Sequence, residues 1–163
     1  MKIASVLVAA ALLSTACTPP GAAPPAPPAP RPSMAYARGA IRARELPGLG
    51  DVLTTDGGFT LYVFEPDGHQ AVSCTDACAG SWPPLFEPPT GRPPAGPGVC
   101  AAMIGATFDP DGGQVITYAG WPLYTYASDL APGQANGQAL NLNGGPWYVI
   151  RPSGQVVEST GVS

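Results

Sequence analysis

The chain of 163 residues contains few charged side chains, with 7 Lys and Arg against 11 Asp and Glu. Binding to nucleic-acid phosphates needs clustered basic residues, so a net charge of −4 argues against a nucleic-acid partner. No apolar run approaches the roughly 20 residues that a membrane-spanning helix requires. The sequence has instead 22 Pro and 21 Gly, and so high a content of helix-breaking residues excludes a coiled coil or a long helical bundle.

Common catalytic motifs are also missing. The single histidine, His69, excludes any metal site built on two or three histidines. The sequence contains no G-x-S-x-G nucleophile elbow and no glycine-rich phosphate-binding loop. Residues 109–113 (DPDGG) resemble part of a calcium loop, but Gly120 stands near the position where an acidic ligand is needed, so they predict a turn. Whether the chain is an enzyme stays open, and a non-enzymatic role is favoured.

The first 16 residues are typical of an export signal. Lys2 supplies a positive charge, an almost entirely apolar run follows over residues 4–13, and small residues precede Cys17. Residues 13–17 (LSTAC) resemble the lipobox of bacterial lipoproteins, with Ser14 where Leu is usual. This resemblance implies a lipoprotein signal peptide over residues 1–16 and a lipid on Cys17, with palmitate as an acyl chain. The alternative is ordinary secretion, with Cys17 removed or unmodified.

A tether follows the signal. Of the sixteen residues 18–33, eight are Pro and four are Ala. Such a segment cannot form a core, and its expected state is a semi-rigid polyproline II stalk. We therefore expect residues 17–50 to be a disordered tether that holds a folded domain away from the membrane.

Residues 51–163 predict a compact, mostly β domain with antiparallel strands. Short stretches rich in aromatic and β-branched residues alternate with Asp-Gly and Asn-Gly turn signals. No window of about 12 residues free of Gly and Pro has the apolar spacing of an amphipathic helix. The expected strands are residues 52–54, 59–64, 115–118, 123–126, 147–150 and 155–158.

The domain contains two related repeats, at about residues 51–100 and 101–163. Residues 58–67 (GFTLYVFEPD) align with residues 120–129 (GWPLYTYASD) at an offset of 62. Each copy has a tyrosine, an aromatic residue two positions later, and an aspartate three positions after that. The repeat-motif residues are Tyr62, Phe64 and Asp67 in the first copy, and Tyr124, Tyr126 and Asp129 in the second.

The spacing of this motif predicts how its side chains are used. In a strand, Tyr62 and Phe64 point to one face, and Leu61 and Val63 to the other. The aspartate lies where the strand ends, so it can accept backbone N–H groups in a turn or a tyrosine hydroxyl. We expect the aromatic residues to be core. A paired-carboxylate site at the repeat junction, and so a hydrolase using both aspartates, is the alternative.

These motifs together resemble the secreted-repeat lipoproteins of bacteria, a family described by the motif Yx(FWY)xxD. Three further stretches carry the resemblance: residues 74–85 (CTDACAGSWPPL), 114–124 (QVITYAGWPLY) and 145–149 (GPWYV). The resemblance covers roughly residues 50–152. It implies an envelope location and tandem repeats, and it brings no established biochemical activity.

The cysteines predict a disulfide, because export routes are oxidising. If Cys17 carries lipid, then Cys74, Cys78 and Cys100 remain, and any two of them could pair. The resemblance favours Cys74–Cys78, since both belong to the family stretch. Cys100 would then be buried or would pair between molecules.

The same segment offers an alternative metal site. His69, Cys74, Cys78 and Cys100, with Met103, are ligand types that copper favours, and three Cys with one His could hold zinc. Their spacings match no common metal motif, and there is no C-x-x-C-H sequence for attached haem. We predict no cofactor, and copper, zinc or haem remain alternatives.

The functional expectation is an exported lipoprotein, anchored to the bacterial cell membrane, with its domain in the periplasm or cell-wall space. Its partners would be the lipid bilayer, through acylated Cys17, and an unidentified envelope partner. From Asp51 onward there are ten acidic residues and two arginines, which favours cationic over anionic partners. The first hypothesis is a non-enzymatic envelope binding or structural module. The second is a periplasmic metal-binding or electron-transfer protein.

Overall fold

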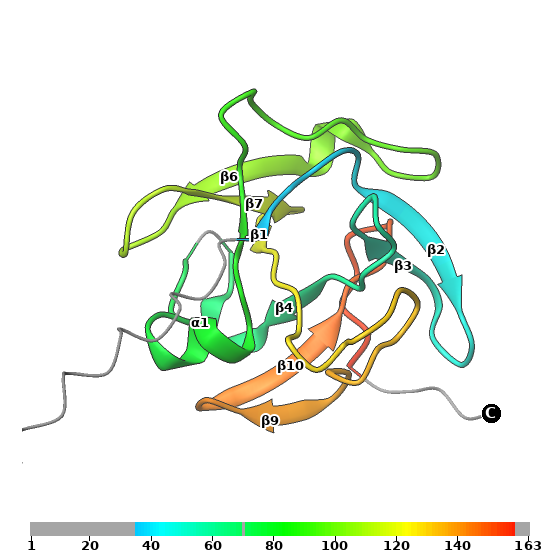
Figure 1. Cartoon of the computed structure of the whole chain (residues 1–163). Coiled ribbons are helices and arrows are strands. Elements are labelled where there is room, and N and C mark those ends of the chain that lie inside the picture. Colours follow the sequence, from blue (N-terminus) through cyan, green and yellow to red (C-terminus); the bar gives the residue numbers. More distant parts are fainter. Residues whose placement is uncertain (1–34, 70, 159–163) are drawn as a thin grey trace, which may run out of the picture.

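A computed structural model describes residues 35–69 and 71–158 (Figure 1). The predicted signal peptide, Cys17 and the Pro/Ala-rich segment lie outside these residues. The described strands are β1 (Ala35–Tyr36), β2 (Arg42–Leu46), β3 (Gly50–Thr54), β4 (Tyr62–Phe64), β5 (Leu85–Phe86), β6 (Ile104–Phe108), β7 (Gln114–Tyr118), β8 (Trp121–Pro122), β9 (Leu140–Leu142) and β10 (Gly145–Val149). One short helix, α1 (Ala77–Ser81), and two 3-10 turns, Glu65–Asp67 and Ala101–Met103, complete the elements.

The strands form three small sheets. The largest has the order β1-β5-β7-β6, with β8 paired to β7, and the second has the order β4-β10-β9. The hairpin β2-β3 is the third, and it lies at one side of the molecule in Figure 1. Every strand pair except β1–β5 is antiparallel, which confirms the predicted mostly antiparallel β fold.

The expected strands are only partly present. Residues 52–54 and 115–118 lie in β3 and β7, and residues 147–149 of the expected strand 147–150 lie in β10. Only the last three residues of 59–64 form β4. Residues 123–126 and 155–158 contribute isolated bridges at Tyr124 and Val156. At Tyr124 one bridge partner is Pro84, and because proline has no N–H it cannot continue a ladder.

The paired strands begin before the boundary expected at Asp51. β2 pairs along its whole length with β3, and Ile41, Leu46 and Leu49 are buried. The sequence of β2 is RAREL, with both arginines exposed, so its composition resembles a polar flank of the tether. Its place in the domain follows from pairing with β3, which composition does not report.

The two repeats meet at one pair of residues. The Tyr62 amide donates to the Tyr124 carbonyl, and the Tyr124 amide donates to the Tyr62 carbonyl, each at 2.9 Å. On either side of this pair the bonding is equivalent, because Leu61 donates to Leu53 and Leu123 donates to Ile116, again at 2.9 Å. The repeats are therefore related by an approximate twofold axis that passes between the two tyrosines.

The motif strands separate two cores. Leu61, Val63 and Leu123 belong to an aliphatic cluster. Tyr62 and Tyr124 belong to an aromatic cluster with Phe64, Trp82 and Trp147. The predicted alternation of faces is therefore present, and both faces are buried, which explains why no position in residues 61–64 is charged.

Candidate functional site

The aromatic cluster at the repeat junction is a stack of four rings. The indole rings of Trp82 and Trp147, one from each repeat, lie parallel with their centroids 3.9 Å apart. Tyr126 stacks on the outer face of Trp82 at 4.1 Å, and Phe64 stacks on Trp147 at 4.3 Å. The order of the stack is Tyr126, Trp82, Trp147, Phe64, so it has the same approximate twofold symmetry as the backbone. Aromatic pairs of this kind contribute about 0.5–1.5 kcal/mol each beyond area burial.

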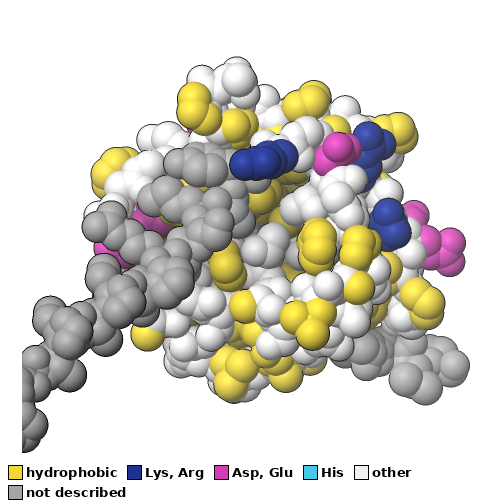
Figure 2. All heavy atoms as spheres, in the orientation of Figure 1, with side chains coloured by type: hydrophobic (Ala, Val, Ile, Leu, Met, Phe, Trp, Pro, Cys, Tyr) yellow, Lys and Arg dark blue, Asp and Glu magenta, His cyan; other side chains and the backbone are white. Residues whose placement is uncertain are grey.

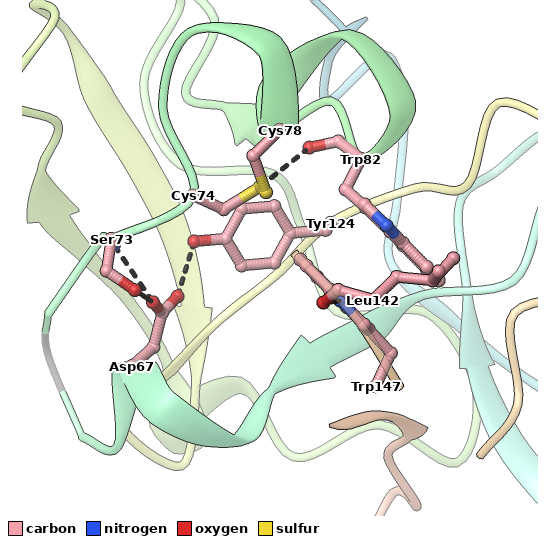
Figure 3. Close-up of a disulfide and its surroundings, with 8 residues drawn as sticks. All are labelled: Asp67, Ser73, Cys74, Cys78, Trp82, Tyr124, Leu142 and Trp147. Carbon is pink, nitrogen blue, oxygen red and sulfur yellow. Dashed lines mark hydrogen bonds between the residues drawn. A yellow bond between two sulfur atoms is a disulfide. The ribbon is translucent and has the colours of Figure 1, made fainter. Parts of the chain in front are cut away.

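The motif tyrosines and aspartates exchange partners between the repeats. The Tyr62 hydroxyl of the first repeat donates to Oδ2 of Asp129 of the second, at 2.7 Å. Reciprocally, the Tyr124 hydroxyl donates to Oδ2 of Asp67, as Figure 3 shows beside the disulfide. Both carboxylates are buried, with exposed fractions of 3% for Asp67 and 6% for Asp129. Each motif is therefore completed by the other copy.

The second oxygen of each carboxylate is also occupied. Oδ1 of Asp67 accepts from the backbone N of Ser73 at 2.9 Å and from its hydroxyl at 2.6 Å. Oδ1 of Asp129 accepts from the backbone N of Asn136 at 2.8 Å. Both roles expected for the aspartates, turn acceptor and tyrosine partner, are thus present in one side chain. The sequence reasoning missed Ser73 and Asn136, although their similar distance after each aspartate is a signal that could have found them.

Burial sets the protonation of this junction. Desolvation, followed by the hydrogen bond to Asp129, raises the pKa of Tyr62 far above its ordinary value. Desolvation and the nearby charge of Asp67 raise the pKa of Tyr124 in the same way. Desolvation also raises the pKa of Asp67, against the opposing effect of its hydrogen bonds from Ser73 and Tyr124. Both phenols therefore stay protonated as donors, and neither carboxylate has an oxygen left without a partner to act on a substrate.

The cysteines are arranged as the resemblance implies. Cys74 and Cys78 form a disulfide with a Cα–Cα distance of 5.2 Å, which confirms the predicted pairing (Figure 3). It links the turn before α1 to that helix and packs against the aromatic cluster. Cys100 is a free thiol and is exposed, so the first of its two expected states, burial, is wrong, and pairing between molecules stays a prediction.

The candidate metal ligands are not gathered at one point. Cys74 and Cys78 are consumed by the disulfide, while the exposed His69 ring lies 4.7 Å from the ring of Trp121 and places Nδ1 3.1 Å from the Ala119 carbonyl oxygen. Within residues 35–69 and 71–158, no group of three or more His, Cys, Asp or Glu side chains could hold a metal ion.

Residues 109–113 form the predicted turn, with Oδ1 of Asp109 accepting from the Asp111 amide at 2.8 Å.

An open groove of about 400 Å³ lies over one side of the junction. It is lined by Arg38, Thr55, Gly57, Phe59, Leu85, Thr125, Tyr126, Ala127 and Asp129. Tyr126 and Asp129 connect it directly to the ring stack and to the Tyr62–Asp129 pair. In Figure 1, the segment around residues 123–129 crosses the face that is turned towards the viewer. Figure 2 shows the same face, and acidic side chains are few on it.

Sequence reasoning found the motif residues of this groove and missed the others. Arg38 and Phe59 lie far from Tyr126 in the chain and reach the groove only through the pairing of β1 with β5 and the packing of the first repeat on the second.

In the part of the chain that the structure describes, no helix is long and apolar enough to span a bilayer.

A family model described as a secreted repeat of unknown function matches residues 47–85 and 106–151, which together are just over half of the chain. The first matched segment contains Tyr62 and the second contains Tyr124. The chain belongs to this secreted-repeat family, as its motifs predicted, and the membership supports export. No curated protein and no solved structure gives a significant match to the chain.

Proposed function

We propose that the chain is a lipoprotein anchored to the bacterial cell membrane through Cys17, and that its β domain is a non-enzymatic binding module of the cell envelope. The Pro/Ala-rich tether sets how far the domain extends from the membrane, and the groove over the repeat junction is the surface that contacts the partner. Residues 1–16 would be the signal peptide that is removed on export.

The observation that carries this proposal is the saturation of the motif carboxylates. Asp67 and Asp129 are the acidic pair that a hydrolase would use, yet each spends both oxygens on hydrogen bonds within the protein. A general acid or base needs to reach the proton that it transfers. The junction therefore supports a rigid scaffold better than a catalytic pair, and its rigidity favours binding because little side-chain entropy is lost when a ligand orders the groove.

The test is co-sedimentation of the chain from Thr18 to Ser163 with isolated envelopes of the producing bacterium. This form keeps the tether, and it keeps every described strand, both cores and the disulfide, because all of them lie between residues 35 and 158. We expect the wild type to sediment with the envelopes and Phe59→Ala to lose most of this binding. Phe108→Ala, at an aromatic residue that is 64% exposed and does not line the groove, is the matched control.

Equal sedimentation of wild type and Phe59→Ala would refute the groove as the contact surface, and no sedimentation of the wild type would refute the binding role. The anchor has a separate test, which is labelling of the full chain with a palmitate analogue in cells. Cys17→Ser should abolish the label and release the protein from the membrane fraction. A labelled Cys17→Ser variant, or an unlabelled wild type, would refute the anchor.

A further inference from the structure

We propose that the groove binds an acidic oligosaccharide, with Arg38 holding a carboxylate of the ligand and the rings of Phe59 and Tyr126 supporting its sugar rings. This inference rests on the proposed binding role of the groove, and it names the ligand class.

The charge of the groove is the first argument. Its residues of opposite charge, Arg38 and Asp129, do not form an ion pair with each other. Asp129 is 6% exposed and its two oxygens accept hydrogen bonds from Tyr62 and Asn136. Arg38 is exposed, and within residues 35–69 and 71–158 no hydrogen bond or ion pair to its guanidinium is found. A guanidinium presents paired donors that match a carboxylate, so the groove selects an anion even though the domain is acidic overall.

The hydroxyl groups of the groove are the second argument. The Thr55 Oγ1 accepts from the Phe59 amide at 3.2 Å, which leaves its own proton available for donation. The Thr125 Oγ1 donates to the Pro83 carbonyl at 3.4 Å, which leaves its lone pairs available as acceptors. The groove that Arg38 lines therefore also offers one hydroxyl donor and one hydroxyl acceptor. Sugar hydroxyls donate and accept at once, so they match both groups.

The apolar lining and the shape are the third argument. Trp82 stacks on one face of the Tyr126 ring and Tyr62 makes a T-shaped contact with it, while the half-buried Tyr126 and the half-buried Phe59 both line the groove. Flat aromatic surfaces suit the apolar faces of sugar rings. A volume of about 400 Å³ lies within the roughly 300–1,000 Å³ range of small-molecule sites. Because the groove is open, a polymer can enter it sideways with both ends outside, whereas a lipid chain would need an enclosed apolar cavity.

The experiment is calorimetric titration of residues 18–163 with tetragalacturonate, and with the same tetramer methyl-esterified as a neutral control of equal shape. We expect the acid to bind at least tenfold more tightly than the ester, and its affinity to fall with added salt. Arg38→Ala should lose at least tenfold in affinity for the acid and little for the ester. Arg38→Lys should keep part of the affinity, because an ammonium retains the charge without the paired donors. Since Arg38 is exposed, these variants should melt at the wild-type temperature, and Arg92→Ala is the matched control at an exposed arginine outside the groove.

Equal binding of acid and ester, or unchanged acid binding in Arg38→Ala, would overturn the role of Arg38. Binding of tetra-aspartate as tight as that of tetragalacturonate would overturn the assignment to a sugar. No binding of either saccharide would overturn the whole inference. If envelope sedimentation still depends on Phe59 in that case, the proposed function stands and only the ligand class fails. If sedimentation is independent of Phe59, both fail.

Discussion

The hydroxyl of Tyr62 donates a 2.7 Å hydrogen bond to Asp129, which belongs to the other repeat. The same bond is made in the opposite direction by Tyr124 and Asp67. The tyrosine of each repeat therefore donates to an aspartate of the other repeat. The aspartate of each repeat accepts from a tyrosine of the other. A buried hydroxyl or carboxylate without its partner is costly, so the two copies stabilise each other as one cooperative unit.

This exchange predicts a specific pattern of energetic coupling. A double-mutant cycle with Tyr62→Phe and Asp129→Asn should give a coupling free energy of about 1–3 kcal/mol, measured by denaturant unfolding, because each single change leaves a buried group without its partner. The cycle with Tyr124→Phe and Asp67→Asn should give a coupling of similar size.

The matched control is the cycle within one repeat. Tyr62 and Asp67 share a motif but no hydrogen bond, so Tyr62→Phe with Asp67→Asn should be additive to within about 0.5 kcal/mol. Coupling within the repeat that equals the coupling across repeats would contradict the exchange.

Asp67 predicts an unusual pH dependence of stability. Burial raises its folded-state pKa above the ordinary value of about 3.9. Between the ordinary pKa and the raised folded-state pKa, the folded protein binds the proton more tightly than the unfolded chain does. The contribution of Asp67 to stability therefore increases as pH falls and is lost as pH rises through the folded-state pKa. The free energy of unfolding of wild type relative to Asp67→Asn should therefore rise on acidification from pH 7 towards the ordinary pKa.

The measurement is denaturant unfolding of both proteins at several pH values, with the difference taken at each. A relative loss of stability of the wild type on acidification would show that the hydrogen bonds from Ser73 and Tyr124 outweigh burial and lower the pKa.

Gly137 is required by the aromatic cluster. A Cβ added there would lie 2.7 Å from Cη2 of Trp82 and 2.9 Å from Cε1 of Tyr62, and both rings are fully buried. Gly137→Ala should therefore destabilise the domain by roughly 1–3 kcal/mol, seen as a lower midpoint of thermal unfolding. Gly80→Ala in α1 is the control, because a Cβ there meets nothing within 4 Å and alanine favours the helix. An unchanged midpoint for Gly137→Ala would contradict the packing of the cluster.

The thiols predict a simple labelling result. In residues 18–163, one thiol should react with an alkylating reagent without denaturant, because Cys100 is exposed while Cys74 and Cys78 are joined. Cys100→Ser should remove the labelling and leave stability within about 0.5 kcal/mol of the wild type.

Replacing Cys74 and Cys78 by serine should lower the free energy of unfolding by about 2 kcal/mol, as the loop-closure entropy of such a short loop predicts. Three reactive thiols in the native protein would contradict the disulfide.

The repeat motif was the most informative part of the sequence. Its alternation placed Tyr62 and Leu61 on opposite faces, and its aspartates were expected to accept a tyrosine hydroxyl or a backbone amide. Local spacing was sufficient here because the direction of a side chain in a strand depends on its position alone. The same reasoning failed for residues 123–126, which do not form a continuous strand. Composition failed for β2, which was assigned to the tether because its sequence is polar.

The sequence by itself determined the β fold, the two repeats, the membership of the secreted-repeat family and, through the resemblance, the Cys74–Cys78 pair. The tertiary structure decided which tyrosine bonds to which aspartate, and it brought Arg38 and Phe59 to the groove beside Tyr126. The physical reason is that these contacts join positions far apart in the chain. Local periodicity reports the face on which a side chain lies, whereas its partner is chosen when the two repeats pack about their common axis.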